Sequence, residues 1–286
     1  NVAIDDNWSV LTTSTPDEVA ERHFKMKAEH VKDTLVGELN AATELTLKRD
    51  NIEFSLSGPS QLLTCKIVDV PGVQQVEIYF KDRGEVELEY AKLTDETQGQ
   101  GLARGFFQAI LKLADRAPEA VRTMTMLANI SVGGYAWARA GFVPDQRELK
   151  SAFRHVLERL DAYLLLDPKN KQVISLRDEL RNQVRYGPNN PRLIRKVAAL
   201  SQPVANKGDL AVPKTGPDSV KGKYTLGKAC LLGTTWEGTF DLVADRKYLE
   251  AYIGMSTAPI VSLTGTSRGN YKSQYERMTW GSKRKN

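Results

Sequence analysis

Four short runs of β-forming residues lie between Asn51 and Leu93, and only turn residues separate them. The runs cover residues 52–57, 62–70, 76–81 and 86–93, with Gly-Pro, Pro-Gly and Asp-Arg-Gly in the spacers. Spacers this short cannot hold crossover helices, so the runs predict a four-stranded antiparallel meander. In the last run, alternation predicts three acids on one face, Glu85, Glu87 and Glu89, and the apolar residues Val86, Leu88 and Tyr90 on the other.

A glycine-containing loop, residues 98–103, follows the fourth run and precedes an amphipathic stretch that ends near Pro118. The stretch predicts a helix, and unpaired amides at a helix start favour an anion. Gly99 and Gly101 would let a phosphate approach the backbone. The loop is not a dinucleotide fingerprint, because a meander precedes it, and it lacks the Gly-Lys-Ser/Thr ending of a P-loop. A fifth strand, 123–128, and a short helix that stops at Gly141 come next.

The segment before the meander, residues 1–50, is expected to be helical. A hydroxyl cap, Pro16 and two acids mark a helix start, and apolar residues then recur with a helical period to about Leu47. His23 and His30 lie seven residues apart on this helix. Without a third ligand they indicate surface or boundary residues rather than a metal site, so no metal is expected.

Beyond the core at residues 51–145 the pattern changes again. Residues 149–166, 173–184 and 191–200 predict three helices within a helical extension, 146–200. Residues 201–223 hold three prolines and three glycines and predict a linker. A small mixed segment, 224–286, closes the chain. These elements define an α+β fold class, and residues 146–286 are a candidate surface for a protein partner.

The last twenty residues are strongly basic. The net charge from 267 to 286 is +5, because six basic residues stand against the single acid Glu276. The basic residues are Arg268, Lys272, Arg277, Lys283, Arg284 and Lys285. The tail is interpreted as a solvated segment, with contact to nucleic acid or an acidic partner as the alternative. No aromatic platform or recognition motif accompanies it, which disfavours nucleic acid.

The composition, 41% hydrophobic and 26% charged over 286 residues, is typical of a soluble globular protein with a full core. No run approaches the roughly 18 apolar residues of a membrane span. The two cysteines, Cys65 and Cys230, are expected as buried thiols in a reducing, cytoplasmic location. The chain begins at Asn1, which suggests a processed product or part of a longer polypeptide.

Residues 51–145 resemble the Gcn5-related N-acetyltransferase (GNAT) superfamily. The family's phosphate loop, Gln/Arg-x-x-Gly-x-Gly/Ala, is matched by Gln98, Gly101 and Ala103, and its Gly-Phe ending by Gly141-Phe142. Leu93 stands where the family's fourth strand ends. The run 133–142 also resembles a divergent branch found in proteins of bacteriophages and mobile elements. The resemblance covers about a third of the chain, and it implies a GNAT-like, mostly antiparallel sheet flanked by helices.

The resemblance implies acetyl-CoA as co-substrate and an N-acyltransferase whose acceptor amine belongs to a protein or a small molecule. The pantetheine arm would pair with backbone near 91–93, and the thioester would lie where the fourth and fifth strands separate. The implied cofactor-binding residues are Leu93, Gln98, Gly99, Gln100, Gly101, Leu102, Ala103 and Asn129.

The position of the proton donor departs from the family pattern. Trp137 stands where the family usually has a Tyr, and Tyr135 is the candidate substitute. Glu87 and Glu89 are the candidate bases, although an alternating charged strand is often just a solvated face. The departure leaves an alternative open: a phage- or virion-associated binding or structural protein that keeps the fold without catalysis.

Overall fold

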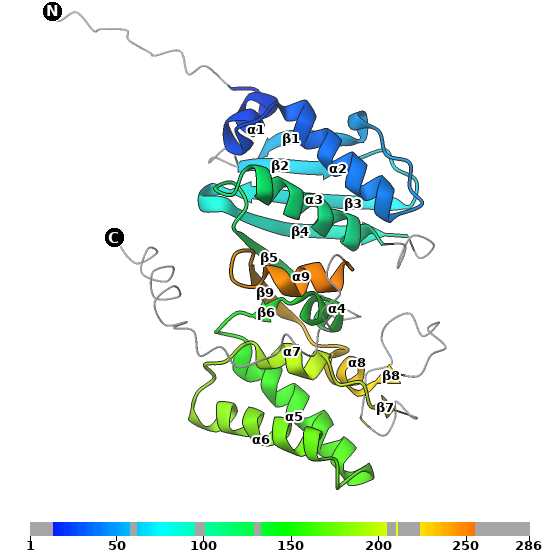
Figure 1. Ribbon diagram of the computed structural model, residues 1–286, viewed down its shortest axis with the longest axis vertical. Helices are drawn as coiled ribbons and strands as arrows, with labels where there is room; N and C mark the ends of the chain where they lie inside the picture. The colour runs from blue at the N-terminus through cyan, green and yellow to red at the C-terminus, as the bar shows by residue number, and fades with distance from the viewer. Residues whose placement is uncertain are drawn as a thin grey trace, which may run out of the picture.

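The computed structural model describes residues 14–57, 62–94, 101–128, 133–204, 210 and 224–254 (Figure 1). These residues form the predicted α+β fold, built on a mixed, mostly antiparallel sheet of seven strands in the order β1-β2-β3-β4-β5-β9-β6. The strands are β1 Ile52–Ser57, β2 Leu62–Ile67, β3 Val73–Lys81, β4 Glu85–Leu93, β5 Thr123–Ala128, β6 Val143–Pro144 and β9 Trp236–Asp241.

The predicted meander is confirmed, since β1, β2, β3 and β4 pair antiparallel in sequence order. The strict alternation predicted for β4 does not continue beyond Leu88. The register pairs Leu88 with Ile78 and Tyr90 with Glu77, which leaves Glu89 without a partner on β3. Such a one-residue bulge shifts the alternation beyond it. The apolar set Val86, Leu88 and Tyr90 therefore does not continue in register through the strand.

Three helices, α1 Pro16–Phe24, α2 Ala28–Ala42 and α3 Leu102–Arg116, cover one face of β1–β4 (Figure 1). The predicted start of α1 is confirmed, because Thr15 and Glu18 form a reciprocal capping box. The single helix expected to reach Leu47 is wrong. Lys25 adopts a left-handed conformation (φ 52°) and ends α1, so the chain turns before α2 begins.

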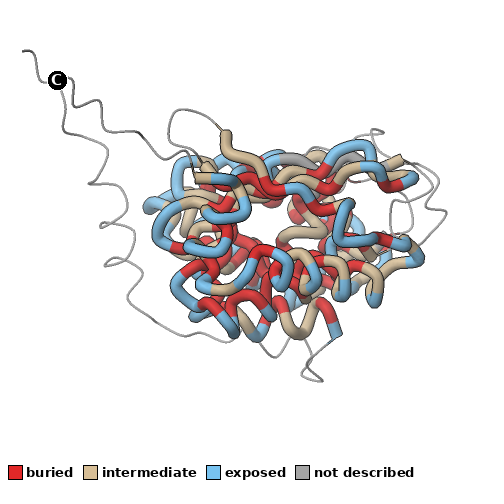
Figure 2. The backbone as a smooth tube through the Cα atoms, turned by 90° about the horizontal axis from the view of Figure 1, so that it is seen from above, coloured by how far each residue is buried: buried red, intermediate tan, exposed pale blue. Residues whose placement is uncertain are grey.

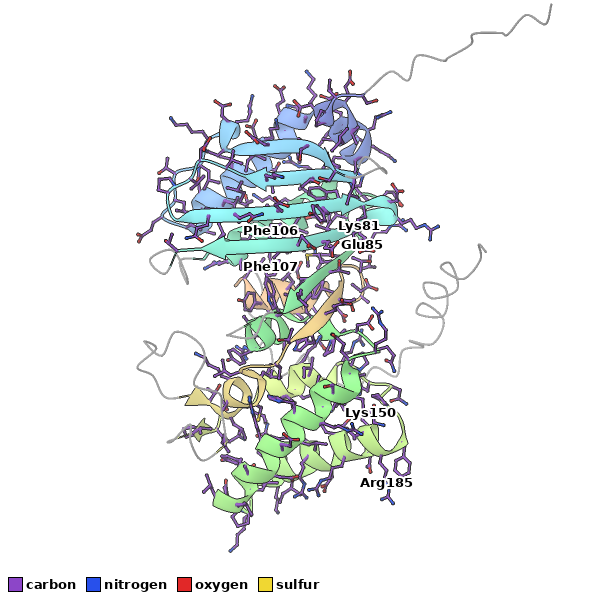
Figure 3. All side chains as sticks on the ribbon, turned by 180° about the vertical axis from the view of Figure 1, so that it is seen from behind. Lys81, Glu85, Phe106, Phe107, Lys150 and Arg185 are labelled. Atoms are coloured by element: carbon purple, nitrogen blue, oxygen red, sulfur yellow. The ribbon has the colours of Figure 1, made fainter. Side chains whose placement is uncertain are left out.

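The opposite face of β1–β4 carries no helix in the described parts of the chain (Figure 3). Its charged side chains pair across the strands. Lys66 Nζ lies 3.2 Å from Glu77, and Lys81 Nζ lies 2.8 Å from Glu85 and 2.6 Å from Glu87. This face is therefore a hydrogen-bonded, polar surface.

The strand β9, from the segment expected as a small C-terminal unit, lies between β5 and β6 in the sheet. A helical insertion therefore separates two neighbouring strands, β6 and β9. The insertion includes a two-stranded sheet, formed by β7 Pro203–Val204 and β8 Tyr224–Thr225, which lie at the two ends of the expected linker. Within that linker, residues 205–209 and 211–223 lie outside the described residues. The helices beyond β5 are α4 Gly133–Ala140, α5 Leu149–Leu166, α6 Lys171–Tyr186, α7 Leu193–Ala198, α8 Leu226–Leu231 and, after β9, α9 Arg246–Tyr252.

A buried ionic cluster fastens this insertion to the sheet domain. Arg195 of α7 donates two hydrogen bonds to Asp245 at the start of α9, at 3.0 and 2.8 Å. Its Nε also donates to the carbonyl oxygen of Gly141 at the end of α4 (2.7 Å). Arg192 donates to the same carboxylate at 2.8 Å. The cluster therefore links α4, α7 and α9 through buried groups, since Arg195 and Asp245 are both buried. Figure 2 shows that buried residues gather in the interior of the molecule and exposed ones at its periphery.

Candidate functional site

The strands β4 and β5 pair in parallel only between residues 85–88 and 123–126. The strand β4 continues to Leu93 along β3, and β5 continues to Ala128 along β9. Beyond Leu88 the two strands therefore separate. The edge of β4 that faces β5 has no partner strand there among the described residues, so its backbone is open to pairing.

The helix α3 begins beyond the separated end of β4 and is electropositive in its first turn. Gly101 is its N-cap, and no described side chain caps the amides that follow. The first turn contains no acid and includes Arg104, and Ala103 and Arg104 are exposed. Amides and dipole together make this turn suited to an anion.

Gly101 also has a packing role that the sequence alone does not show. Its φ is +93°, and a Cβ there would overlap the carbonyl oxygen of Ala42 at the end of α2. One turn later, a Cβ on Gly105 would lie 2.9 Å from the backbone carbonyl oxygen of Glu38 and 2.9 Å from the Cα of Leu39. The two glycines let α2 and α3 approach closely, so their presence alone does not require a phosphate.

An apolar cavity lies between β4, β5 and the helices α3 and α4. Its side chains leave no space wide enough for a water molecule. Figure 3 labels Phe106 and Phe107, which α3 contributes to it. The lining residues are Val86, Leu88, Phe106, Phe107, Met124, Thr125, Met126, Trp137 and Phe142.

The candidate proton donor Tyr135 lies on α4, half-buried against the core, and is not among the residues that line the cavity. Trp137 packs edge-on against Phe107 (5.6 Å between ring centroids), as a core aromatic would. A second phenol, Tyr252 of α9, contacts Phe107 from another side (6.2 Å). The pKa of Tyr252 lies above its ordinary value, chiefly because the phenol is buried. The charge of Arg139 lowers this pKa and that of Tyr135 raises it, so both side chains interact electrostatically with Tyr252. Tyr252 could not be predicted from the sequence, since nothing local to it indicates that it lies near α4.

The candidate bases do not lie beside Tyr135. Glu87 shares its face with Glu85, opposite the helices, where Figure 3 shows Lys81 and Glu85 from behind. Burial lowers the pKa of Lys81, but hydrogen bonds to the carboxylates of Glu85 and Glu87 raise it, and the pKa lies above its ordinary value. Glu87 is therefore held by an ammonium group, whereas Glu89 is exposed at the bulge of β4.

Several expected binding residues cannot be placed. Gln98, Gly99, Gln100 and Asn129 lie outside the described residues, as does the basic tail, 267–286. The backbone of Leu93 ends β4, and Gly101, Leu102 and Ala103 begin α3. The described part of the expected site therefore brings together the end of β4 and the start of α3.

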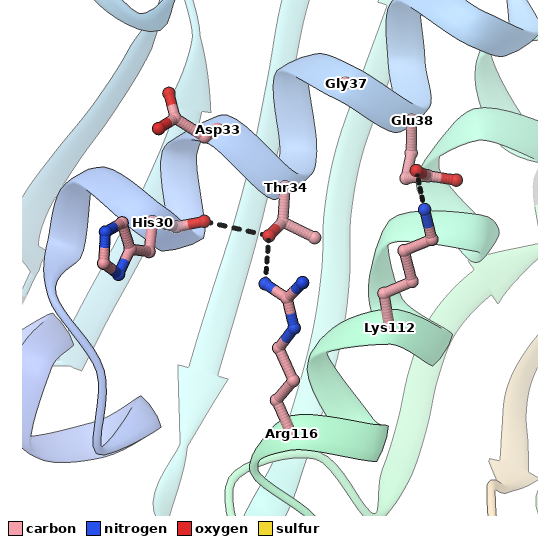
Figure 4. A pocket seen from close by; sticks show the side chains of 7 residues that line it. All are labelled: His30, Asp33, Thr34, Gly37, Glu38, Lys112 and Arg116. Atoms are coloured by element: carbon pink, nitrogen blue, oxygen red, sulfur yellow. Dashed lines mark hydrogen bonds and ion pairs between the residues drawn. The ribbon is translucent and has the colours of Figure 1, made fainter.

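A surface groove of about 460 Å³ lies elsewhere, between α2 and the C-terminal half of α3 (Figure 4). Lys112 in it bonds Glu38, and Arg116 donates to the hydroxyl of Thr34 (3.2 Å). Its lining is mostly exposed and combines no apolar wall with convergent polar groups, so the groove is a weaker candidate than the separated strands.

The described residues offer few other groups for catalysis or metal binding. No group of three or more His, Cys, Asp or Glu side chains there is placed to hold a metal ion. Cys65 and Cys230 are buried free thiols, and burial raises the pKa of each to about 12. His23, half-buried, lies 3.2 Å from the carbonyl oxygen of Ala120. None of the described helices is long and apolar enough to cross a bilayer.

Comparisons of the chain with family models, with curated proteins and with solved structures found no match. The resemblance to the GNAT superfamily therefore rests on the sequence motifs.

Proposed function

We propose that the protein binds acetyl-CoA at the separated ends of β4 and β5 and transfers the acetyl group to an amine. The observation that carries the proposal is the single geometry formed by three elements. A parallel pair separates beyond Leu88, a helix whose first turn no described side chain caps begins after Gly101, and an apolar cavity lies between the strands and this helix. The mostly antiparallel sheet flanked by helices, with its parallel β4–β5 pair, is compatible with the GNAT-like arrangement that the motifs imply.

In this proposal each part of the thioester meets a group suited to it. The first turn of α3 binds the pyrophosphate through amides and Arg104. The open edge of β4 near Leu93 pairs with the amides of the pantetheine arm. The acyl group lies at the mouth of the apolar cavity, close to Trp137.

The transfer itself is an aminolysis. The amine nitrogen bonds to the carbonyl carbon, the C–S bond breaks, the amine loses a proton, and the departing thiolate gains one. Positioning supplies most of the acceleration for such a reaction. Tyr135 is the proposed donor to the thiolate, and Glu89, exposed and without an ion pair among the described residues, is the proposed acceptor, directly or through water.

A substitution at Ala103 tests the placement of the pyrophosphate. Ala103→Glu puts a negative charge in the exposed first turn of α3, where an acid is tolerated and adds about 0.3–1 kcal/mol of helix stability. Unit charges about 4 Å apart repel by up to about 4 kcal/mol at an effective dielectric of about 20. We therefore expect the dissociation constant of CoA, measured by titration calorimetry, to rise at least about tenfold.

Ala103→Gln is the matched control, because it adds the same length without charge. It should bind CoA within about threefold of the wild type. Equal affinities for the Glu and Gln variants would show that the pyrophosphate does not lie at α3. Absence of CoA binding by the wild-type protein would remove the proposed function itself.

A second candidate is a protein of this fold that binds without catalysis. Two observations favour it: the ion pair of Glu87 with Lys81, and the packing of Trp137 among aromatic rings. Product formation separates the two candidates. The enzyme releases free CoA from acetyl-CoA when amines are supplied, whereas the second candidate binds acetyl-CoA or a partner and releases none.

A further inference from the structure

The indole of Trp137 completes the aromatic side of the cavity. Trp137 stands edge-on to Phe107 and to Phe142, with centroid distances of 5.6 and 5.5 Å and interplanar angles of 83° and 69°. Behind this layer Phe142 packs on Phe240 at 5.3 Å. Because Phe240 is itself buried, the rings on the inner side of the cavity have no free space to move into.

The mouth of the cavity can be located from exposure. Most lining side chains are buried, whereas Leu88, Thr125 and Trp137 are half-exposed. The hydroxyl of Thr125 donates a hydrogen bond to Glu85 on the helix-free face of the sheet, so its exposure does not mark the mouth. The mouth therefore lies between Trp137 of α4 and Leu88, the last residue of β4 that pairs with β5. Trp137 is the larger of the two, and its removal would widen the mouth.

We propose that Trp137 sets the size of the acyl group, so that the protein accepts acetyl and propionyl thioesters and rejects chains of about six carbons or more. This inference rests on the proposed function. The cavity does not admit a water molecule, so even a small acyl group requires a side chain at the mouth to shift. A two-carbon group needs a small shift of Leu88 or Trp137. A long chain must displace the indole from both of its edge-on contacts.

The test compares the affinities of CoA, acetyl-CoA and octanoyl-CoA by titration calorimetry. For the wild type we expect octanoyl-CoA to bind at least about tenfold more weakly than acetyl-CoA. Trp137→Ala opens the wall, and each methylene that then becomes buried gains roughly fourfold in affinity. Octanoyl-CoA should therefore bind this variant at least tenfold more tightly than it binds the wild type, and the ratio of the octanoyl-CoA affinity to the acetyl-CoA affinity should rise.

A milder variant, Trp137→Phe, keeps an aromatic ring in the wall and covers the case in which the alanine variant does not fold. It should accept butyryl-CoA and hexanoyl-CoA better than the wild type does, and octanoyl-CoA less well than the alanine variant. Far-ultraviolet circular dichroism and the unfolding midpoint check the fold of each variant.

The outcomes separate the two proposals. If no CoA species binds the wild type, the proposed function is wrong and the size limit falls with it. If CoA and acetyl-CoA bind but octanoyl-CoA binds equally well, the size limit is wrong and the CoA site stands. If the wild type discriminates but neither Trp137 variant changes the discrimination, another residue sets the limit.

Discussion

Replacement of Asp245 by alanine is expected to lower the free energy of unfolding by about 3–5 kcal/mol. The Asp245 side chain is 3% exposed, and it accepts hydrogen bonds from Arg195, which is 2% exposed, and from Arg192. Without the carboxylate, the guanidinium of Arg195 stays buried with no counter-ion. Arg195 also bonds the Gly141 carbonyl, so the loss should loosen α4 as well. Urea unfolding followed by circular dichroism measures the effect.

Asp115 provides the control, since it too pairs with an arginine of the α9 region. It bonds Arg246 but is 55% exposed. Exposed ion pairs contribute little, so Asp115→Ala should lower the free energy of unfolding by less than about 1 kcal/mol. Equal effects of the two substitutions would contradict the view that the Asp245 cluster fastens the insertion.

Gly101→Ala is expected to lower the free energy of unfolding by about 2–4 kcal/mol. The residue has φ +93°, which a side chain disfavours, and the added Cβ would overlap the Ala42 carbonyl oxygen. Substitution at this glycine therefore damages the fold as well as any anion site. Only a variant such as Ala103→Glu can report on ligand binding without this effect.

Gly37, in the middle of α2, is the matched control. No atom lies within 4 Å of a Cβ built there, so alanine at this position should raise the stability by about 0.5–1 kcal/mol through helix propensity. Thermal or urea unfolding of both variants compares the two glycines. A Gly101→Ala protein as stable as the wild type would show that α2 and α3 do not pack as described.

The parts of the fold that depend on short-range patterns could be predicted from the sequence. The meander followed from closely spaced β runs, and the helix 149–166 from its apolar period, which α5 reproduces. The features set by distant contacts could not. The strand β9 pairs with β5 across the whole insertion, and the left-handed Lys25 and the bulge at Glu89 occur at residues that do not signal them.

The candidate site shows the same division. The helix start after Gly101 could be predicted because a glycine loop followed by an apolar period is a local feature, and α3 begins there. The close approach of α2 to Gly101, which gives that glycine a packing role, depends on two helices that are distant in sequence. The contact of Tyr252 with Phe107 likewise arises only when α9 packs on α3 and α4. Burial and ion pairing of side chains such as Glu87 are therefore visible only in the folded chain.

The most direct test of the central claim is the stability of the wild-type protein with and without acetyl-CoA. A ligand at 100 times its dissociation constant should stabilise the folded state by about 2.7 kcal/mol. For a chain of this size, each kcal/mol raises Tm by about 2–4 °C. GTP, which carries a polyphosphate but no pantetheine arm, should give a much smaller shift. An unchanged Tm at millimolar acetyl-CoA would contradict the account.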